Sequence, residues 1–130
     1  MKLIVLSGEF AVARLAASDA IPAWAMAAPI SSVTRTPDEL SIVCAASHLP
    51  PQAAAERGWR CLRVAGTIDF AAVGVLAAIA GPLAAAGVSI FAISTYDTDY
   101  VLVREHALSA AIAALTAAGH DLDAVRGRQP

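Results

Sequence analysis

The side chains that most often carry out catalysis are few in this chain and lie far apart. The two cysteines, Cys44 and Cys61, each fall in a predicted buried strand, where a thiol behaves as a small apolar side chain. The three histidines, His48, His106 and His120, follow none of the spacings of a metal site. No nucleophile elbow, P-loop or dinucleotide-binding fingerprint occurs. The sequence therefore predicts a protein that is not an enzyme and that uses neither a metal nor another cofactor.

Polar and acidic side chains gather instead in two segments of the second half. Asp69 stands before a long apolar segment, where the N-cap of a helix is expected. Gly74, inside that predicted helix, costs about 1 kcal/mol relative to alanine, which favours either close packing or the close approach of a ligand. The second segment is 94–99, and Asp99 is its best candidate for binding because Glu39 holds an acid at the matching position of an internal repeat.

Composition limits the class of protein before any element is assigned. Hydrophobic residues make up 58% of the 130 residues and charged residues 15%, which excludes a disordered chain. The net charge of −2 offers no basic stripe, so we expect no nucleic-acid partner. The uncharged segment 70–96 is interrupted by Gly81-Pro82 and by Gly87, which favours a buried helix and a strand over a membrane span. The apolar run Leu3–Leu6 is too short for a signal peptide, so we expect a cytoplasmic protein.

The hydrophobic pattern predicts an α+β protein. Strands are expected at Leu3–Leu6, Phe10–Leu15, Ser31–Thr36, Leu40–Cys44, Trp59–Ala65, Ser89–Thr95, Tyr100–Arg104 and Leu122–Val125. Helices are expected at Ile21–Ala28, Pro50–Arg57, Phe70–Ala86 and His106–Ala118. Pro82 either kinks the third helix or marks its last turns. From Trp59 onward the order is βαββαβ, which predicts a ferredoxin-like unit with an antiparallel sheet and helices on one face.

An internal repeat indicates two such units in one chain. Ser32–Val43 is similar to Ala92–Val103, with an offset of 60 residues, in its branched and hydroxyl residues, its acid and its closing aliphatic pair. We predict a degenerate first unit over residues 1–58, a second unit over 59–125 and a tail over 126–130. Two similar hairpins on unrelated backgrounds are the alternative.

Two stretches of the second unit resemble an ACT domain, of the kind found in cytosolic arginine sensors and in the regulatory domains of aspartate kinases. They are Gly81–Ile90 and Ala92–Val103, and Ser32–Glu39 carries a matching signature in the first half. The resemblance implies tandem ferredoxin-like ACT units with a regulatory role. It also implies that a free amino acid is the ligand and that it binds at an interface between ACT units.

The resemblance further implies where the ligand binds: at the loop after the first strand, at the helix start and at the end of the second strand. Those positions are Thr67, Ile68, Asp69, Phe70, Val73, Gly74, Val75, Ser94, Thr95, Tyr96 and Asp99. Helix N–H groups could hold the ligand's carboxylate and an acidic side chain its ammonium. We expect a homodimer, because small sheets leave edge strands that invite pairing. The alternative function is an ACT interaction or oligomerisation module that binds no small molecule.

Overall fold

The chain folds into two compact units in the computed structural model, which describes residues 1–27 and 29–124. Unit 1 comprises Met1–Ser7 and the chain from Arg60 onward, and unit 2 comprises Gly8–Trp59. Ala28 in the first predicted helix, Val125 in the last predicted strand and the predicted tail lie outside the described residues. Each unit has its own hydrophobic core.

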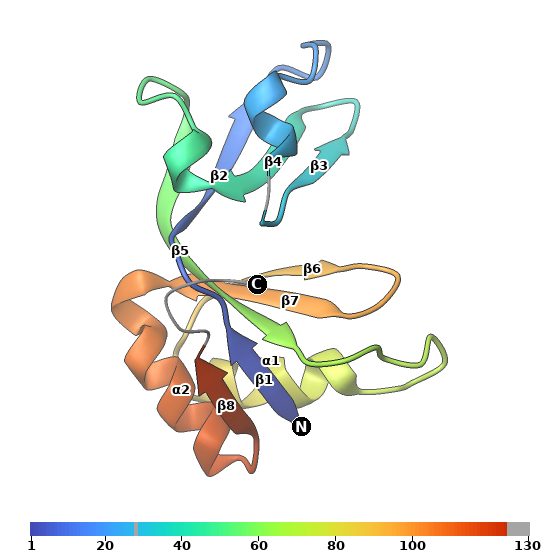
Figure 1. Cartoon of the computed structure of the whole chain (residues 1–130), viewed down its shortest axis with the longest axis vertical. Helices are drawn as coiled ribbons and strands as arrows, with labels where there is room; N and C mark the ends of the chain where they lie inside the picture. The colour runs from blue at the N-terminus through green and yellow to red at the C-terminus, as the bar shows by residue number, and fades with distance from the viewer. Residues whose placement is uncertain (28, 125–130) are drawn as a thin grey trace. The chain divides into compact units, whose positions relative to one another are not determined.

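Unit 1 contains the predicted βαββαβ order and is an α+β, ferredoxin-like unit (Figure 1). Its elements are β5 (Ala55–Val64), α1 (Val75–Ala85), β6 (Ile90–Ser94), β7 (Asp99–Arg104), α2 (Leu108–Ala117) and β8 (Asp121–Ala124). A turn of 3-10 helix over Glu105–Ala107 joins β7 to α2. The hydrophobic pattern of the second half therefore predicted the kind and the order of these elements correctly.

The first strand of the chain, β1 (Lys2–Val5), belongs to unit 1 and not to the first unit that the sequence predicted over residues 1–58. It pairs antiparallel with β5 and parallel with β8, so the strand order in unit 1 is β8-β1-β5-β7-β6 (Figure 1). The physical reason is burial. Leu3 and Val5 are enclosed in the same core as Leu62 and Val64 of β5.

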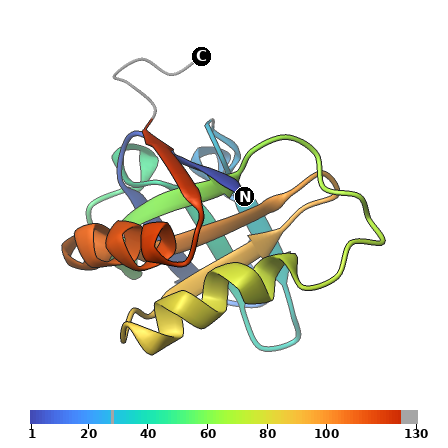
Figure 2. The same cartoon turned by 90° about the horizontal axis from the view of Figure 1, so that it is seen from below.

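The two helices of unit 1 lie side by side on one face of its sheet (Figure 2). α1 buries Ile79 and Leu83, and α2 buries Ala111 and Leu115, all in the core that the sheet strands complete. This confirms the predicted layer of helices. No helix among the described residues is long and apolar enough to cross a membrane.

The start of α1 differs from the sequence prediction, which placed it at Phe70 with Asp69 as the N-cap. The N-cap is Gly74, whose φ of +81° lies in the left-handed region that favours glycine. Asp69 instead closes a separate turn, where its Oδ1 accepts a hydrogen bond from the N–H of Ala71 at 3.0 Å. Pro82 lies inside α1, which continues beyond it to Ala85, so this proline does not end the helix.

Unit 2 is built from strands and two short turns of 3-10 helix. Its strands are β2 (Phe10–Leu15), β3 (Ser32–Arg35), β4 (Leu40–Ala45) and the first part of β5, in the order β3-β4-β2-β5. The 3-10 turns cover Ala23–Met26 and Ala46–His48.

The two helices predicted in this half are wrong. Over its described residues 21–27, the segment predicted as Ile21–Ala28 contains only a 3-10 turn, Ala23–Met26. The segment predicted as Pro50–Arg57 runs into β5, where Ala55 and Glu56 pair with β2. Pairing with a neighbouring strand outweighs the helix propensity of alanine there.

The two predicted hairpins are present, but the pairing of their strands gives a different offset from the one predicted for the internal repeat. Arg35 pairs with Leu40 across the β3–β4 hairpin, and Ser94 pairs with Asp99 across the β6–β7 hairpin. The offset between the two turns is therefore 59 residues (94 − 35), not 60. Asp99 corresponds to Leu40, so the match with Glu39 that favoured Asp99 is not a structural one.

The buried thiol of Cys61 makes stability fall at high pH. Burial raises its pKa from the ordinary 9.0 to about 12, so above pH 9 the unfolded chain loses a proton that the folded chain keeps. The free energy of unfolding therefore keeps its full value below pH 9. Between pH 9 and pH 12 it falls by about 1.4 kcal/mol per pH unit. Urea unfolding between about pH 8 and pH 10.5 measures this change. The free energy of unfolding is expected to fall more steeply with pH for the natural chain than for Cys61→Ser. Equal slopes would contradict this assignment.

Candidate functional site

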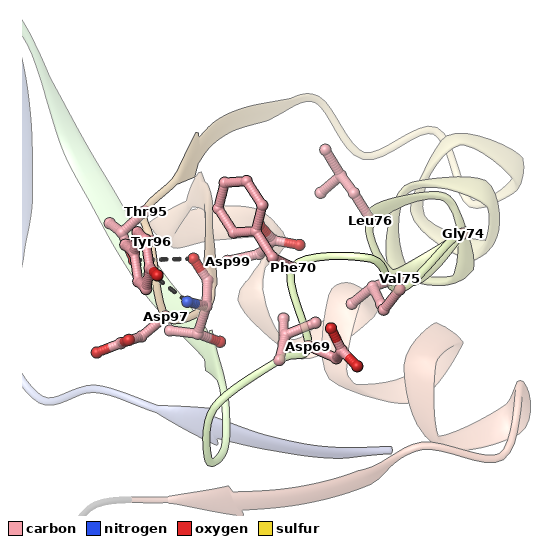
Figure 3. A pocket seen from close by; sticks show the side chains of 12 residues that line it. Asp69, Phe70, Gly74, Val75, Leu76, Thr95, Tyr96, Asp97 and Asp99 are labelled. Carbon is pink, nitrogen blue, oxygen red and sulfur yellow. Dashed lines mark hydrogen bonds between the residues drawn. The ribbon is translucent and has the colours of Figure 1, made fainter.

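A pocket of about 270 Å³ opens beside the N-terminal end of α1 (Figure 3). One wall comes from the loop between β5 and α1 and from the first residues of that helix. The other wall comes from the turn between β6 and β7. The lining residues are Ile68, Asp69, Phe70, Ala72, Gly74, Val75, Leu76, Thr95, Tyr96, Asp97, Thr98 and Asp99.

Two hydrogen bonds join the walls of this pocket to each other and to the sheet. The N–H of Ile68 donates to the carbonyl of Asp97 at 2.7 Å, which connects the loop to the turn. The hydroxyl of Thr98 donates to the carbonyl of Val64 in β5 at 2.8 Å, and Thr98 is only 5% exposed. The turn is therefore fixed to the strand from which the loop departs.

Thr95 shapes the turn itself. Its N–H and its hydroxyl both donate to the carbonyl of Thr98, at 2.8 and 3.0 Å, and the hydroxyl accepts from the N–H of Thr98 at 3.2 Å. Thr36 makes the same set of bonds with Glu39 in the hairpin of unit 2. A threonine that closes the turn on its own backbone is thus common to both hairpins.

Two aromatic side chains stand at the rim of the pocket. Phe70 and Tyr96 are 79% and 82% exposed, and their ring centroids lie 5.3 Å apart at an interplanar angle of 35°. Figure 3 shows the two rings side by side, with Gly74, Val75 and Leu76 beyond Phe70. Large apolar groups that remain this exposed are available to cover a ligand.

Acidic residues and the positive end of a helix dipole both line the pocket. Asp69, Asp97 and Asp99 are the acidic lining residues, and no basic residue is among the residues that line the pocket. Gly74 and Val75 bring the N-terminal end of α1, where the first N–H groups have no partner inside the helix and the helix dipole is positive. The pocket can therefore offer acceptors to a cation and donors to an anion at the same time.

The structure brings together most of the residues that the sequence proposed for the site. Eight of them line the pocket: Ile68, Asp69, Phe70, Gly74, Val75, Thr95, Tyr96 and Asp99. Thr67, Val73 and Ser94 do not line it, and Val73 is 94% exposed.

Sequence reasoning missed Ala72, Leu76, Asp97 and Thr98. Asp97 and Thr98 lie in the turn between β6 and β7, and this turn also forms a pocket wall. Leu76 lies in the first turn of α1 and packs partly against the core of unit 1. Ala72 lies in the loop that precedes α1. Among the described residues, no group of histidine, cysteine and acidic side chains could hold a metal ion.

Thr98→Val is expected to lower the free energy of unfolding by about 1–3 kcal/mol. The substitution keeps the shape of the side chain but leaves the buried carbonyl of Val64 without the donated hydrogen bond. Urea unfolding measures the change, with Thr36→Val as a control because the Thr36 hydroxyl bonds only within its own turn. A larger loss in Thr36→Val than in Thr98→Val would contradict the prediction.

The ferredoxin-like βαββαβ unit fits the resemblance of the sequence to an ACT domain. A family model described as an ACT domain matches residues 54–117, and a second model, for an N-terminal domain, matches residues 8–52. The chain belongs to the ACT-domain family.

Two further proteins are similar to this chain in sequence. A protein of known structure from Agrobacterium tumefaciens is 40% identical, with a TM-score of 0.92 over 99% of this chain and 96% of its own. The human cytosolic arginine sensor for mTORC1 subunit 1 is 43% identical over 58 residues, which are 44% of this chain and only 18% of that protein.

The regulatory subunit of aspartate kinase from Thermus thermophilus has a TM-score of 0.61 at 13% identity. The match covers 86% of this chain and 93% of that one. At this identity the likeness shows a shared fold.

Proposed function

We propose that this chain is a regulatory module that binds a free amino acid in the pocket beside α1. The observation that carries the proposal is the meeting of carboxylates and helix N–H groups in one cavity of about 270 Å³. A zwitterion needs an acceptor for its ammonium group and donors for its carboxylate within one cavity.

The orientation of the ligand follows from the two walls. The N–H groups at the start of α1 bind the α-carboxylate, because a helix N-terminus favours an anion. Asp99, at the beginning of β7 in the opposite wall, accepts hydrogen bonds from the α-ammonium. The rings of Phe70 and Tyr96 then cover the side chain of the ligand.

The charge of the pocket favours a neutral or cationic side chain on that ligand. Asp69 and Asp97 add negative charge beside Asp99, and no basic side chain lines the cavity to receive a third carboxylate. A cation can also stack on the exposed aromatic rings. L-Arginine is the first candidate, because a relative is named as an arginine sensor, and we expect aspartate and glutamate to be excluded.

We further propose that two copies of the chain associate through β6. Ile90–Ser94 pairs with β7 on one side and carries no charged residue or proline. Such an edge strand lacks the devices that prevent pairing with another chain. Multi-angle light scattering is expected to give twice the mass of the 13.3 kDa chain, and Ala92→Lys to give the single-chain mass.

The central experiment is a thermal-shift screen of the twenty amino acids, followed by calorimetric titration. We expect one or a few saturable ligands, with a rise in the unfolding temperature that grows with ligand concentration. If none of the twenty binds, the alternative is favoured, an ACT interaction module without a small-molecule ligand. The exposed Phe70, Val73 and Tyr96 would then form part of its contact surface.

A further inference from the structure

The carbonyl of Ala78 lacks its usual partner within α1. A helical carbonyl accepts a hydrogen bond from the N–H four residues later, and for Ala78 that residue is Pro82, which has no N–H. The Nε2 atom of His120 lies 2.9 Å from this carbonyl oxygen. Because a carbonyl oxygen only accepts, Nε2 carries the hydrogen. The Nδ1 atom is then an acceptor for the terminal nitrogen of Met1, 3.3 Å away.

The end of α2 fixes the backbone from which this side chain projects. Gly119 has a φ of +97°, and the N–H of His120 donates to the carbonyl of Leu115 at 3.0 Å. This is the six-to-one bond of a Schellman motif, which needs glycine at the position before His120. α1 ends in the same way, but there the equivalent position is the apolar Val88. The motif itself therefore does not require a histidine.

We propose that His120 is a positioning residue for the pocket. It supplies the hydrogen bond that Pro82 cannot make, and so holds the first turn of α1 in place. The N–H of Ala78 donates to the carbonyl of Gly74 at 2.9 Å, so a shift at Ala78 is passed directly to the pocket wall. His120 is not among the lining residues and acts only through the helix. Its effect on ligand affinity rests on the proposed function, whereas the hydrogen bond does not.

A double-mutant cycle on the full chain tests this role. Pro82→Ala restores a backbone N–H that satisfies the Ala78 carbonyl, and His120→Ala removes the substitute donor. In the natural background we expect His120→Ala to lower the urea midpoint and to shift the amide ¹H–¹⁵N signals of Gly74, Val75 and Leu76. In the Pro82→Ala background both effects are expected to be largely absent.

Two results would overturn the proposal. One is an equal effect of His120→Ala in both backgrounds, since the histidine would then act independently of the proline. The other is a ¹⁵N imidazole spectrum at neutral pH with the hydrogen of His120 on Nδ1, because that ring could not donate from Nε2.

Titration with L-arginine separates this proposal from the proposed function. If arginine binds, His120→Ala is expected to raise its Kd about three- to tenfold, and to leave it unchanged in the Pro82→Ala background. An unchanged Kd in the natural background would refute the positioning role. If arginine does not bind the natural chain, its assignment as ligand fails, and the stability and amide measurements still decide the role of His120.

Discussion

Replacing Asp99 by asparagine is expected to weaken amino-acid binding by about one to two orders of magnitude. Asp99 is the first residue of β7, pairs with Ser94 across the hairpin and lines the pocket. Asparagine keeps the size of the side chain but removes the charge that the ligand's ammonium needs. Calorimetry measures the Kd, and circular dichroism verifies that the variant is folded.

Asp38→Asn is the matched control for this substitution. Asp38 is an exposed acid in the hairpin turn of unit 2, where its N–H bonds to the Thr36 hydroxyl and its side chain lies outside the pocket. The Asp38→Asn variant is expected to bind the amino acid with the same Kd as the natural chain. Asp97 is unsuitable as a control because it lines the pocket. An unchanged Kd in Asp99→Asn would place the ammonium elsewhere.

Leu83→Ala is expected to lower the free energy of unfolding by about 2–5 kcal/mol. Leu83 is fully buried in the core between α1 and the sheet of unit 1. Truncation removes apolar contacts and leaves a cavity that packed neighbours fill only in part. A loss of this size is a large fraction of the stability of a small domain, so the urea midpoint should fall clearly at a constant m-value.

Val73→Ala provides the comparison for the core variant. Val73 is 94% exposed, so the same kind of truncation removes almost no buried contact. Its free energy of unfolding is expected to stay within about 0.5 kcal/mol of the natural value. If Val73→Ala were as destabilising as Leu83→Ala, that side chain would have to be buried in solution, for instance between two copies of the chain.

The fold of unit 1 could be predicted because its hydrophobic pattern has the period of each element. Leu83 and Leu115 mark helix faces that bury one stripe, and the continuous apolar run Tyr100–Val103 marks the buried strand β7. The insertion of β1 beside β8 could not be predicted, since pairing between distant segments leaves no local pattern. Pro50–Arg57 failed for a related reason, because its alanines favour a helix while its neighbours in space are strands.

Most residues of the predicted site line the pocket, but the structure changes the local role of some of them. The sequence predicts Asp69 as the N-cap of α1, whereas it closes a turn of its own. An aspartate is common both at a helix N-cap and in a turn, so the sequence alone does not distinguish the two positions. Asp99 was selected partly through the match with Glu39, which the strand register does not support. The proposed role of Asp99 in ligand binding therefore depends on its position in the pocket wall.

The position of β1 between β5 and β8 has a consequence for synthesis on the ribosome. Unit 2 is continuous in sequence and is expected to fold as soon as residue 59 has emerged. The sheet of unit 1 cannot close at that time, because Lys2 must wait for Asp121, its partner in β8. The earliest strand to be made is thus among the last to be enclosed on both sides. Until β8 has emerged, the edge of β1 that β8 covers remains unpaired.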